Sequence, residues 1–324
     1  MSNKEKFYGV NESNWGHKWG YKDSRFKINS DKSVTFTGKR YPICGKRLYN
    51  FIPFVEEILG VEFALEPKVK EVEERYVSDP NINEPFMADL KESFDADRFS
   101  GEHNERLLHS HGQHSTDEVY KVLYNRLDQF ADLVFYIESE EETVKLIDLA
   151  QKHNVCLIPY GGGTNVTNAL RPPKGEKRMV VSVDTRRMDA VESVDEHNLM
   201  VTVGAGITGK VLEQELNKKG FTVGHEPDSY EFSTVGGWIS TNAAGMKKHK
   251  YGNIEDIVQN LRMVTPKGVI NQKKPLTRSS FGIKAQNILF GSEGNLGIIT
   301  SATLKVHRLP ESSAYESIIF KDWD

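Results

Sequence analysis

The sequence predicts an α+β fold, in which a partly helical N-terminal region precedes a segment built from many short strands. Glycine is spread unevenly, because eight of the 26 glycines lie in residues 1–160 and eighteen lie in residues 161–324. From residue 127 onward, short apolar runs typical of strands alternate with helical apolar patterns. These two observations together indicate a mixed fold whose second part contains the sheets.

Composition and charge exclude several classes of protein. The chain has 324 residues, 38% apolar and 27% charged, which excludes a wholly disordered or a collagen-like chain. A net charge of −4 disfavours broad, non-specific nucleic-acid binding. No run approaches the ~20 apolar residues that a membrane-spanning helix needs. Only two cysteines occur, Cys44 and Cys156, so we expect at most one disulfide and a reducing compartment.

Two patterns predict local structure in the N-terminal region. Residues 33–37 alternate between polar and apolar and end at Gly38, which predicts a strand and a turn. Residues 51–60 predict a short amphipathic helix that ends at its glycine. We expect the apolar face of this helix to be buried on the body of the protein. A helix on a membrane surface is the alternative, which the acidic polar face disfavours. The charged residues 66–82 are predicted to be a linker or an exposed helix.

Six strands and two helices are predicted beyond residue 127. One helix follows the first strand, because Ser139 and Glu142 have the spacing of a capping box and Asn154 can end the helix. The other helix fits residues 209–219 and ends at Gly220. The strands are expected at residues 133–137, 155–159, 179–185, 199–203, 261–265 and 298–307.

The loop after the second strand, residues 159–165, contains three consecutive glycines. Glycine lets the backbone approach a ligand closely, and successive free N–H groups form a nest that suits a phosphate or pyrophosphate. Thr164 and Asn165 add side-chain donors. Taken alone, the triple glycine could equally form a sharp structural turn.

A second glycine-rich loop, residues 203–209, contains the pattern G-x-G-x-x-G between a predicted strand and a predicted helix. An acidic residue, Asp228, lies about 20 residues further on, as in nicotinamide-binding Rossmann units. Such a unit needs a full second strand after the helix, and here only residues 221–223 are available. We therefore expect a tight strand-to-helix turn with some cofactor contact rather than a Rossmann site.

Two further loops complete the set. Residues 224–245 are almost all small, polar or glycine, and a polar loop of this length is uncommon unless it is functional. The basic run 247–250 follows, either as a solvated face or as electrostatic help for a phosphate. Residues 291–297 contain three glycines directly before a strand. Four glycine-rich loops at strand ends predict a large phosphate-bearing cofactor across the sheet ends.

These loops resemble the FAD-binding half of the alkylglycerone-phosphate synthase family, within the vanillyl-alcohol-oxidase-type (PCMH-type) flavoproteins. The most specific runs are Glu-Pro-Asp-Ser-Tyr-Glu-Phe-Ser-Thr-Val-Gly-Gly-Trp at 226–238 and Gly-Met-Lys-Lys at 245–248. The stretches 18–26 and 37–42 are also similar to this family, so the resemblance covers most of the chain. It implies a two-subdomain FAD-binding domain after a mainly helical N-terminal region.

The resemblance implies that four loops contact FAD. The flavin is expected to be bound non-covalently, because members with an attached flavin carry a histidine in the first loop and this chain has Gly163 and Thr164. The implied cofactor-binding residues are Tyr160, Gly161, Gly162, Gly163, Thr164, Asn165, Val166, Asp228, Ser229, Tyr230, Glu231, Phe232, Ser233, Thr234, Thr241, Asn242, Ala243, Ala244, Glu293, Gly294, Asn295, Leu296, Gly297, Ile298 and Ile299.

The family implied by these loops exchanges the acyl group of acyl-dihydroxyacetone phosphate for a long-chain fatty alcohol. The product is alkyl-dihydroxyacetone phosphate, made through a flavin N5 adduct without net oxidation or reduction, in ether-lipid biosynthesis. Homodimerisation, peripheral membrane contact and a peroxisomal location are also implied, although neither end of the chain shows a targeting signal.

The resemblance also implies domain bounds. Residues 1–126 form the N-terminal region, residues 127–309 form the FAD-binding domain, and residues 310–324 begin a cap domain that the chain does not continue. The cap carries the family's catalytic acid and base, so no catalytic residue is assigned, and we expect a fragment or a short isoform.

Other interpretations remain open at this point. An FAD-linked 2-hydroxy-acid dehydrogenase of the D-lactate type would share the glycine loops, and a truncated, non-catalytic form is a third hypothesis. The histidines His103, His109, His111 and His114 have spacings that could bind zinc, but no cysteine or carboxylate pattern completes a site, so no metal is expected. Cys156 is predicted to be an inert core thiol.

Overall fold

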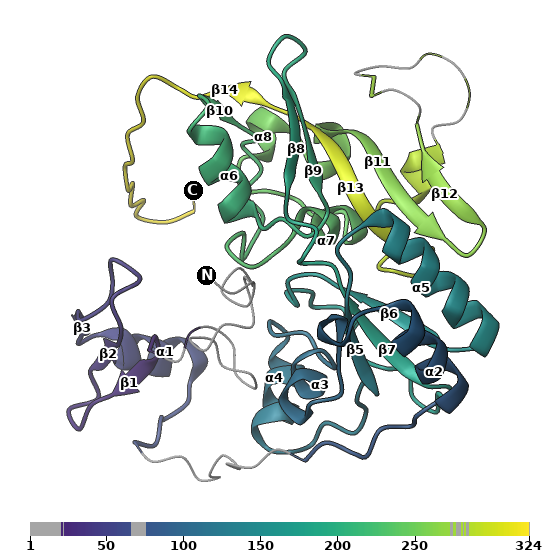
Figure 1. Cartoon of the computed structure of the whole chain (residues 1–324). Coiled ribbons are helices and arrows are strands. Elements are labelled where there is room, and N and C mark those ends of the chain that lie inside the picture. Colours follow the sequence, from purple (N-terminus) through teal and green to yellow (C-terminus); the bar gives the residue numbers. More distant parts are fainter. Residues whose placement is uncertain are drawn as a thin grey trace.

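The computed structural model describes residues 21, 23–65, 76–272, 275–276, 280, 282 and 285–323. It is a mixed fold of helices and sheets, as the sequence predicts (Figure 1). The two larger sheets lie one above the other in Figure 1, and a small N-terminal sheet lies to one side. Four of the nine residues of the motif at 18–26, and most of the charged stretch at 66–82, fall outside the described residues.

The N-terminal module, residues 23–65 together with Tyr21, holds one small antiparallel sheet and one helix. The sheet contains β1 (Phe26–Ile28), β2 (Val34–Phe36) and β3 (Arg47–Leu48). Helix α1 (Phe51–Leu59) ends at Gly60, whose φ of 61° is the left-handed conformation that favours glycine at a helix end. The predicted strand and the predicted helix are therefore both present.

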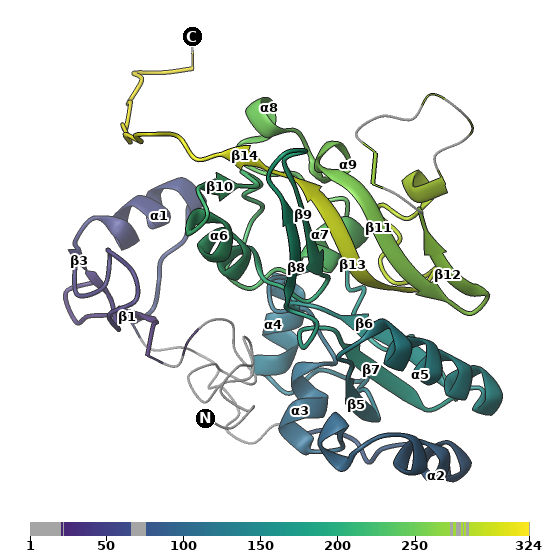
Figure 2. The same ribbon diagram turned by 45° about the horizontal axis from the view of Figure 1, so that its top comes forward.

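The prediction that the apolar face of α1 is buried on the body is wrong. Only Ile52 of this helix is buried, whereas Phe54, Ile58 and Leu59 are each at least 60% exposed. The physical reason is the size of the module, because its strands have two or three residues each and cover little of the helix. Figure 2 shows α1 at the edge of the molecule.

The four-stranded sheet has the order β4 (Phe99–Ser100), β5 (Leu133–Tyr136), β7 (Val180–Asp184) and β6 (Cys156–Tyr160). Strands β5 and β6 run parallel to β7, so the carboxyl ends of these three strands lie at one edge. The triple-glycine loop follows β6 directly and therefore begins at this edge.

Helix α5 (Glu140–His153) connects β5 to β6. The Ser139 hydroxyl accepts a hydrogen bond from the Glu142 N–H at 3.1 Å, which confirms half of the predicted capping box. The Glu142 carboxylate does not complete the box, because it accepts from the Glu138 N–H and pairs with Arg98. Helix α5 ends at Asn154 in the left-handed conformation, as predicted.

Helices before residue 127 pack against the same sheet. Helix α2 (Glu84–Ser93) packs on α5, and α3 (His103–Leu108) lies against β5. Helix α4 (Thr116–Leu123) and the short helix η2 (Ala96–Arg98) complete this part. The domain boundary at residue 127 stays a prediction. Helices α2 and α3 precede this boundary, but they pack on α5 and β5, which follow it.

The five-stranded sheet is antiparallel throughout, in the order β12 (Gly268–Asn271), β11 (Val258–Thr265), β13 (Ile298–Lys305), β9 (Met200–Gly204) and β8 (Val191–Asp195). Its apolar face packs on helices. The remaining elements are α6 (Gly209–Asn217), α7 (Val235–Ser240), α8 (Lys248–Tyr251), α9 (Ile254–Ile257), the short helix η3 (Ala285–Ile288), and β10 (Phe221–Thr222) paired with β14 (His307–Arg308).

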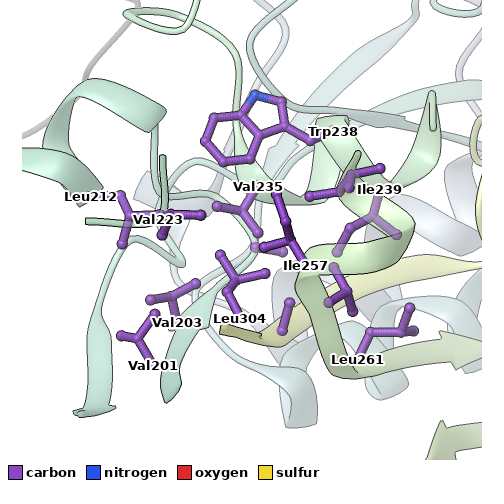
Figure 3. Close-up of a cluster of buried hydrophobic side chains, with 14 of the residues drawn as sticks. Val201, Val203, Leu212, Val223, Val235, Trp238, Ile239, Ile257, Leu261 and Leu304 are labelled. Atoms are coloured by element: carbon purple, nitrogen blue, oxygen red, sulfur yellow. The ribbon is translucent and has the colours of Figure 1, made fainter. Parts of the chain in front are cut away.

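The core around the five-stranded sheet is one contiguous cluster of buried apolar side chains. Figure 3 shows Trp238 of α7 above valines of β9 and Leu304 of β13, with Leu212 of α6 beside them. Trp238 is 2% exposed and its indole N–H donates to the Ser233 hydroxyl at 2.8 Å. This packing fixes α7, and with it the loop that enters α7.

The two large sheets are joined at α5, which packs against β11 and β13 where the sheets meet (Figure 1). The Arg262 guanidinium pairs with the Glu140 carboxylate, which also accepts from the Thr300 hydroxyl at 3.0 Å. This ion pair therefore fixes the orientation of one sheet relative to the other. No helix among the described residues is long and apolar enough to cross a membrane.

The antiparallel neighbours of β9 rule out a Rossmann unit at residues 204–209, in agreement with the sequence-based expectation. A Cβ atom at Gly206 would lie less than 3.0 Å from the Thr185 carbonyl oxygen. This glycine is thus explained by the close packing of the turn on the loop after β7. The turn lies outside the wall of the cavity described below, and its contact with the cofactor stays a prediction.

Candidate cofactor-binding site

A cavity of about 320 Å³ lies between the triple-glycine loop and the segment around α7. Three stretches of chain that are far apart in the sequence meet at this cavity. Fourteen of the predicted site residues line it: Gly161, Gly162, Gly163, Thr164, Asn165, Val166, Asp228, Ser233, Thr234, Thr241, Ala243, Ala244, Glu293 and Gly294. Eight further lining residues stand outside the predicted set of site residues. Five of them lie within the predicted loops 159–165 and 224–245, namely Pro159, Pro227, Gly237, Trp238 and Ser240, and only Thr167, Ala169 and Leu170 were not anticipated.

The triple-glycine loop presents its backbone to the cavity. Gly163 has a φ of 69°, the left-handed conformation, so the loop reverses sharply after β6. In the described part of the chain, the N–H groups of Gly162, Gly163 and Thr164 donate to no protein acceptor. Unpaired N–H groups at a cavity wall are suitable donors for phosphate oxygens.

Close contact between the triple-glycine loop and the segment before α7 explains two of the glycines. A Cβ atom at Gly162 would lie less than 3.0 Å from the Phe232 carbonyl, and one at Gly161 would meet the Thr234 hydroxyl. The Thr234 hydroxyl also accepts from the Gly237 N–H at 3.2 Å and so caps α7. The loop after β6 and the loop before α7 therefore lie directly against each other.

A buried charged cluster lies beneath the triple-glycine loop. Asp184 pairs with Arg186 and, at 2.9 Å, with His109, and all three are at most 8% exposed. Burial alone would raise the pKa of Asp184, but the Arg186 and His109 side chains hold it well below its ordinary value of 3.8. The ring of Tyr160 lies 4.4 Å from the His109 ring, and burial raises the pKa of Tyr160 to about 12.

The histidine-rich segment after α3 supports the loop and does not converge on one point. The Gln113 N–H donates to the Gly163 carbonyl at 2.7 Å. His109 contacts Asp184, whereas His111 contacts the Gly112 carbonyl and His114 contacts the Ser229 hydroxyl. In the described ranges no three histidine, cysteine or acidic side chains gather to hold a metal ion.

The described residues that line the cavity are either acidic or uncharged. Two carboxylates, Asp228 and Glu293, line it, and no lysine or arginine does. The basic run 247–250 does not reach it, and Lys247 pairs with Glu226 at 2.5 Å. Lys247 is thus paired with a carboxylate, and the electrostatic role considered for the run stays a prediction. Neutral donors remain for a phosphate, namely backbone N–H groups and the Thr164 hydroxyl, whereas the Thr241 hydroxyl already donates to the Gly237 carbonyl at 2.9 Å.

A second cavity, of about 550 Å³, adjoins the first, and Pro159 and Gly294 belong to both walls. The predicted residues Asn295, Leu296, Gly297 and Ile298 line this second cavity. Cys156 also lines it, so the predicted core position is wrong and this thiol is half-buried at a cavity wall. Both Cys156 and Cys44 are free thiols.

Seven predicted site residues line neither cavity. Tyr160 is buried below the loop and Ile299 lies in the core of β13. The others belong to the outer part of the segment before α7 or follow α7 directly: Ser229, Tyr230, Glu231, Phe232 and Asn242. Their proximity to the cavities is consistent with the motif, although their side chains do not form the walls.

Two buried histidines make the fold sensitive to acid. Burial lowers the pKa of His111 and of His225 to about 4. In an unfolded chain these rings take up a proton near their ordinary pKa of 6.5, so the unfolded state binds more protons between pH 6.5 and pH 4. Stability is therefore expected to fall as the pH decreases through this window.

Urea unfolding near pH 7 and near pH 5 tests this expectation. The variant His225→Phe keeps an aromatic ring against Trp238, whose ring centroid lies 5.0 Å from that of His225. The phenyl ring cannot take up a proton. We expect this variant to lose less stability between the two pH values than the wild type does. Equal losses in the two proteins would contradict the assignment to His225.

The donor set fits FAD. A pyrophosphate needs several N–H or hydroxyl donors, which the triple-glycine loop and Thr164 provide. Two adjoining cavities that share Pro159 and Gly294 also suit a ligand longer than either cavity. The fold and the site therefore define a flavoprotein, and the comparisons agree, because a family model described as an FAD binding domain matches residues 131–272. The chain belongs to the PCMH-type FAD family, and FAD is its cofactor.

Comparison with individual proteins shows which flavoproteins the chain is similar to. The chain is 43% identical to the alkyldihydroxyacetonephosphate synthase of Caenorhabditis elegans over 306 residues, which is 94% of this chain and 51% of the relative. A solved structure of an alkyldihydroxyacetonephosphate synthase superposes with a TM-score of 0.83 at 32% identity, covering 93% of this chain and 56% of that chain. A mitochondrial D-lactate dehydrogenase of Arabidopsis thaliana is only 28% identical, over 67% of this chain and 36% of that protein. The chain thus spans about half the length of the synthases that it matches.

Proposed function

We propose that the chain is the FAD-binding part of an alkylglycerone-phosphate synthase. The observation that carries this proposal is the meeting of residues 161–166, 228–244 and 293–294 at one cavity lined by neutral donors. The similarity to the synthases over 94% of the chain supports the same reaction class. In that reaction a fatty alcohol replaces the acyl group of acyl-dihydroxyacetone phosphate, and the fatty acid is released.

The two large sheets correspond to the two subdomains of the FAD-binding unit in this proposal. The unpaired N–H groups of Gly162, Gly163 and Thr164 bind the pyrophosphate. Residues 295–298 and Pro159 hold one end of the cofactor in the second cavity. When bound, the flavin ring supplies the reactive centre for the exchange, and the residues described here bind and orient it and exclude water.

The composition of the walls supports non-covalent binding of FAD. Among the described residues, no histidine, cysteine or tyrosine lines the first cavity, so its wall offers none of the side chains that commonly attach to a flavin. The second cavity holds one such side chain, Cys156, and burial raises the pKa of its thiol, which disfavours the reactive thiolate.

We propose, from the synthase resemblance alone, that residues 310–324 lead into a substrate-binding domain and that the whole protein acts as a peroxisomal, membrane-associated homodimer.

The exchange reaction can be tested directly. The FAD-loaded protein, in which this chain continues into its substrate-binding domain, is incubated with palmitoyl-dihydroxyacetone phosphate and labelled hexadecanol, and the labelled ether product and the released palmitate are quantified. The proposal predicts equal amounts of both products and no bleaching of the flavin by D-lactate. Bleaching by D-lactate without ether product would instead support a 2-hydroxy-acid dehydrogenase, and neither reaction would support a non-catalytic chain.

A further inference from the structure

The N-terminal module contacts the body of the protein next to the cofactor cavity. The Tyr41 hydroxyl donates to the Glu231 carboxylate at 2.7 Å, across 190 residues of sequence. The ring of Tyr21 packs on the ring of Phe232 with their centroids 5.5 Å apart. Arg40 lies over the Tyr21 ring at 3.9 Å and pairs with Asp23, so this aromatic contact is held in place within the module.

One of the residues that the module contacts, Phe232, also contacts the triple-glycine loop. The Phe232 carbonyl lies against Gly162, where a Cβ atom would come closer than 3.0 Å. The next two residues, Ser233 and Thr234, line the cavity. One short segment, the loop 229–233, therefore touches the N-terminal module on one side and the predicted pyrophosphate site on the other.

The loop 229–233 has a conformation that needs external support. Ser229 has a φ of 58°, which is unfavourable for a residue with a side chain. The carbonyl of Ser229 accepts from the N–H groups of Phe232 and Ser233, which closes a tight turn. Strained turns of this kind persist where surrounding contacts fix them. Here those contacts are His114 on the Ser229 hydroxyl, and Tyr41 and Tyr21 of the module.

The bond between Tyr41 and Glu231 is suited to this role. Burial and the Glu231 carboxylate raise the pKa of Tyr41 above its ordinary value of 10.0, so the hydroxyl is a donor near neutral pH. Lys210 lies 3.9 Å from the other carboxylate oxygen of Glu231 and forms an ion pair with it. A charged acceptor makes such a hydrogen bond stronger than a neutral pair.

We infer that the N-terminal module is a positioning element for the cofactor, and that Tyr41 and Glu231 are positioning residues. By holding the loop 229–233 against Gly162, they keep the pyrophosphate site in its binding geometry. This inference rests on the proposed placement of FAD between the triple-glycine loop and the segment before α7.

Hydrogen exchange and FAD affinity, measured on the whole chain, test the inference. Tyr41→Phe removes the hydroxyl and keeps the ring, and Tyr49→Phe makes the same change at a tyrosine of the same module that is 63% exposed. Loss of a hydrogen bond to a charged acceptor predicts about tenfold faster exchange of the amides of residues 229–234 in Tyr41→Phe, with or without FAD. The same variant is expected to bind FAD about five- to tenfold more weakly. Tyr49→Phe should match the wild type in both measurements.

A second pair of variants separates positioning from general destabilisation. Glu231→Gln keeps an oxygen that accepts from Tyr41 and should retain most of the protection, whereas Glu231→Ala should lose as much as Tyr41→Phe. Wild-type exchange in Tyr41→Phe would overturn the inference, as would faster exchange with unchanged FAD affinity. A wild-type chain that binds no FAD would contradict the proposed function, and the exchange rates would still decide whether the module holds the loop.

Discussion

Gly162→Ala is expected to weaken FAD binding about 10- to 100-fold while leaving the fold intact. The new methyl group would come closer than 3.0 Å to the Phe232 carbonyl, and neither backbone can move aside by a simple side-chain rotation. Overpacking of this kind costs about 1–3 kcal/mol, and each 1.4 kcal/mol changes an affinity tenfold. Gly162 does not have a positive φ, so alanine meets no conformational penalty there and the variant isolates the steric effect.

The affinity of the apo chain for FAD, followed by flavin fluorescence, measures this effect. Gly101→Ala is the matched control, because a Cβ atom at Gly101 meets nothing within 4 Å and this glycine also lacks a positive φ. The control should bind FAD like the wild type. An unchanged affinity in Gly162→Ala would show that the contact between the two loops is not needed for binding.

Asp184→Asn is expected to have the largest effect on stability. The change leaves the Arg186 guanidinium buried without its carboxylate, and breaking a buried pair in this way typically costs about 3–5 kcal/mol. A matched change in an exposed pair, Asp117→Asn beside Lys121, should cost about 0.5 kcal/mol or less. Urea unfolding of the three proteins near neutral pH measures both values.

The pH dependence of the Asp184→Asn effect provides a second check. Because the pKa of Asp184 in the folded state lies below its ordinary value of 3.8, the carboxylate stabilises the fold above that pH. Its contribution is lost as the pH falls further, through the folded pKa. The difference between the wild type and Asp184→Asn should therefore be constant near neutral pH and should shrink in acid. A difference that grows in acid would contradict the assignment.

Local patterns predicted much of the fold correctly. Each of the six strands predicted beyond residue 127 is present, with its ends within three residues of the prediction, and Gly60 and Asn154 end their helices as expected. Short edge strands such as β8, whose side chains are mostly exposed, escaped prediction because they lack an apolar face. The exposure of α1 could not be predicted either, since it depends on how little sheet the N-terminal module provides.

The candidate site was predicted in part. The glycine motifs identified three of the loops that meet at the cavity, and motif resemblance placed residues 295–298 near it. The buried pair of Asp184 and Arg186, and the support from Tyr41, depend on contacts across long stretches of sequence. No periodicity or spacing marks such contacts, so only the three-dimensional structure reveals them.

The absorption spectrum of the purified chain, before and after acid precipitation, tests the central claim most directly. The account predicts flavin bands in the native protein, with about one FAD for each chain after added FAD is removed, and complete transfer of the bands to the acid supernatant. A chain that stays colourless after incubation with FAD, or a flavin that stays in the precipitate, would contradict the account of a non-covalent FAD site built by these loops.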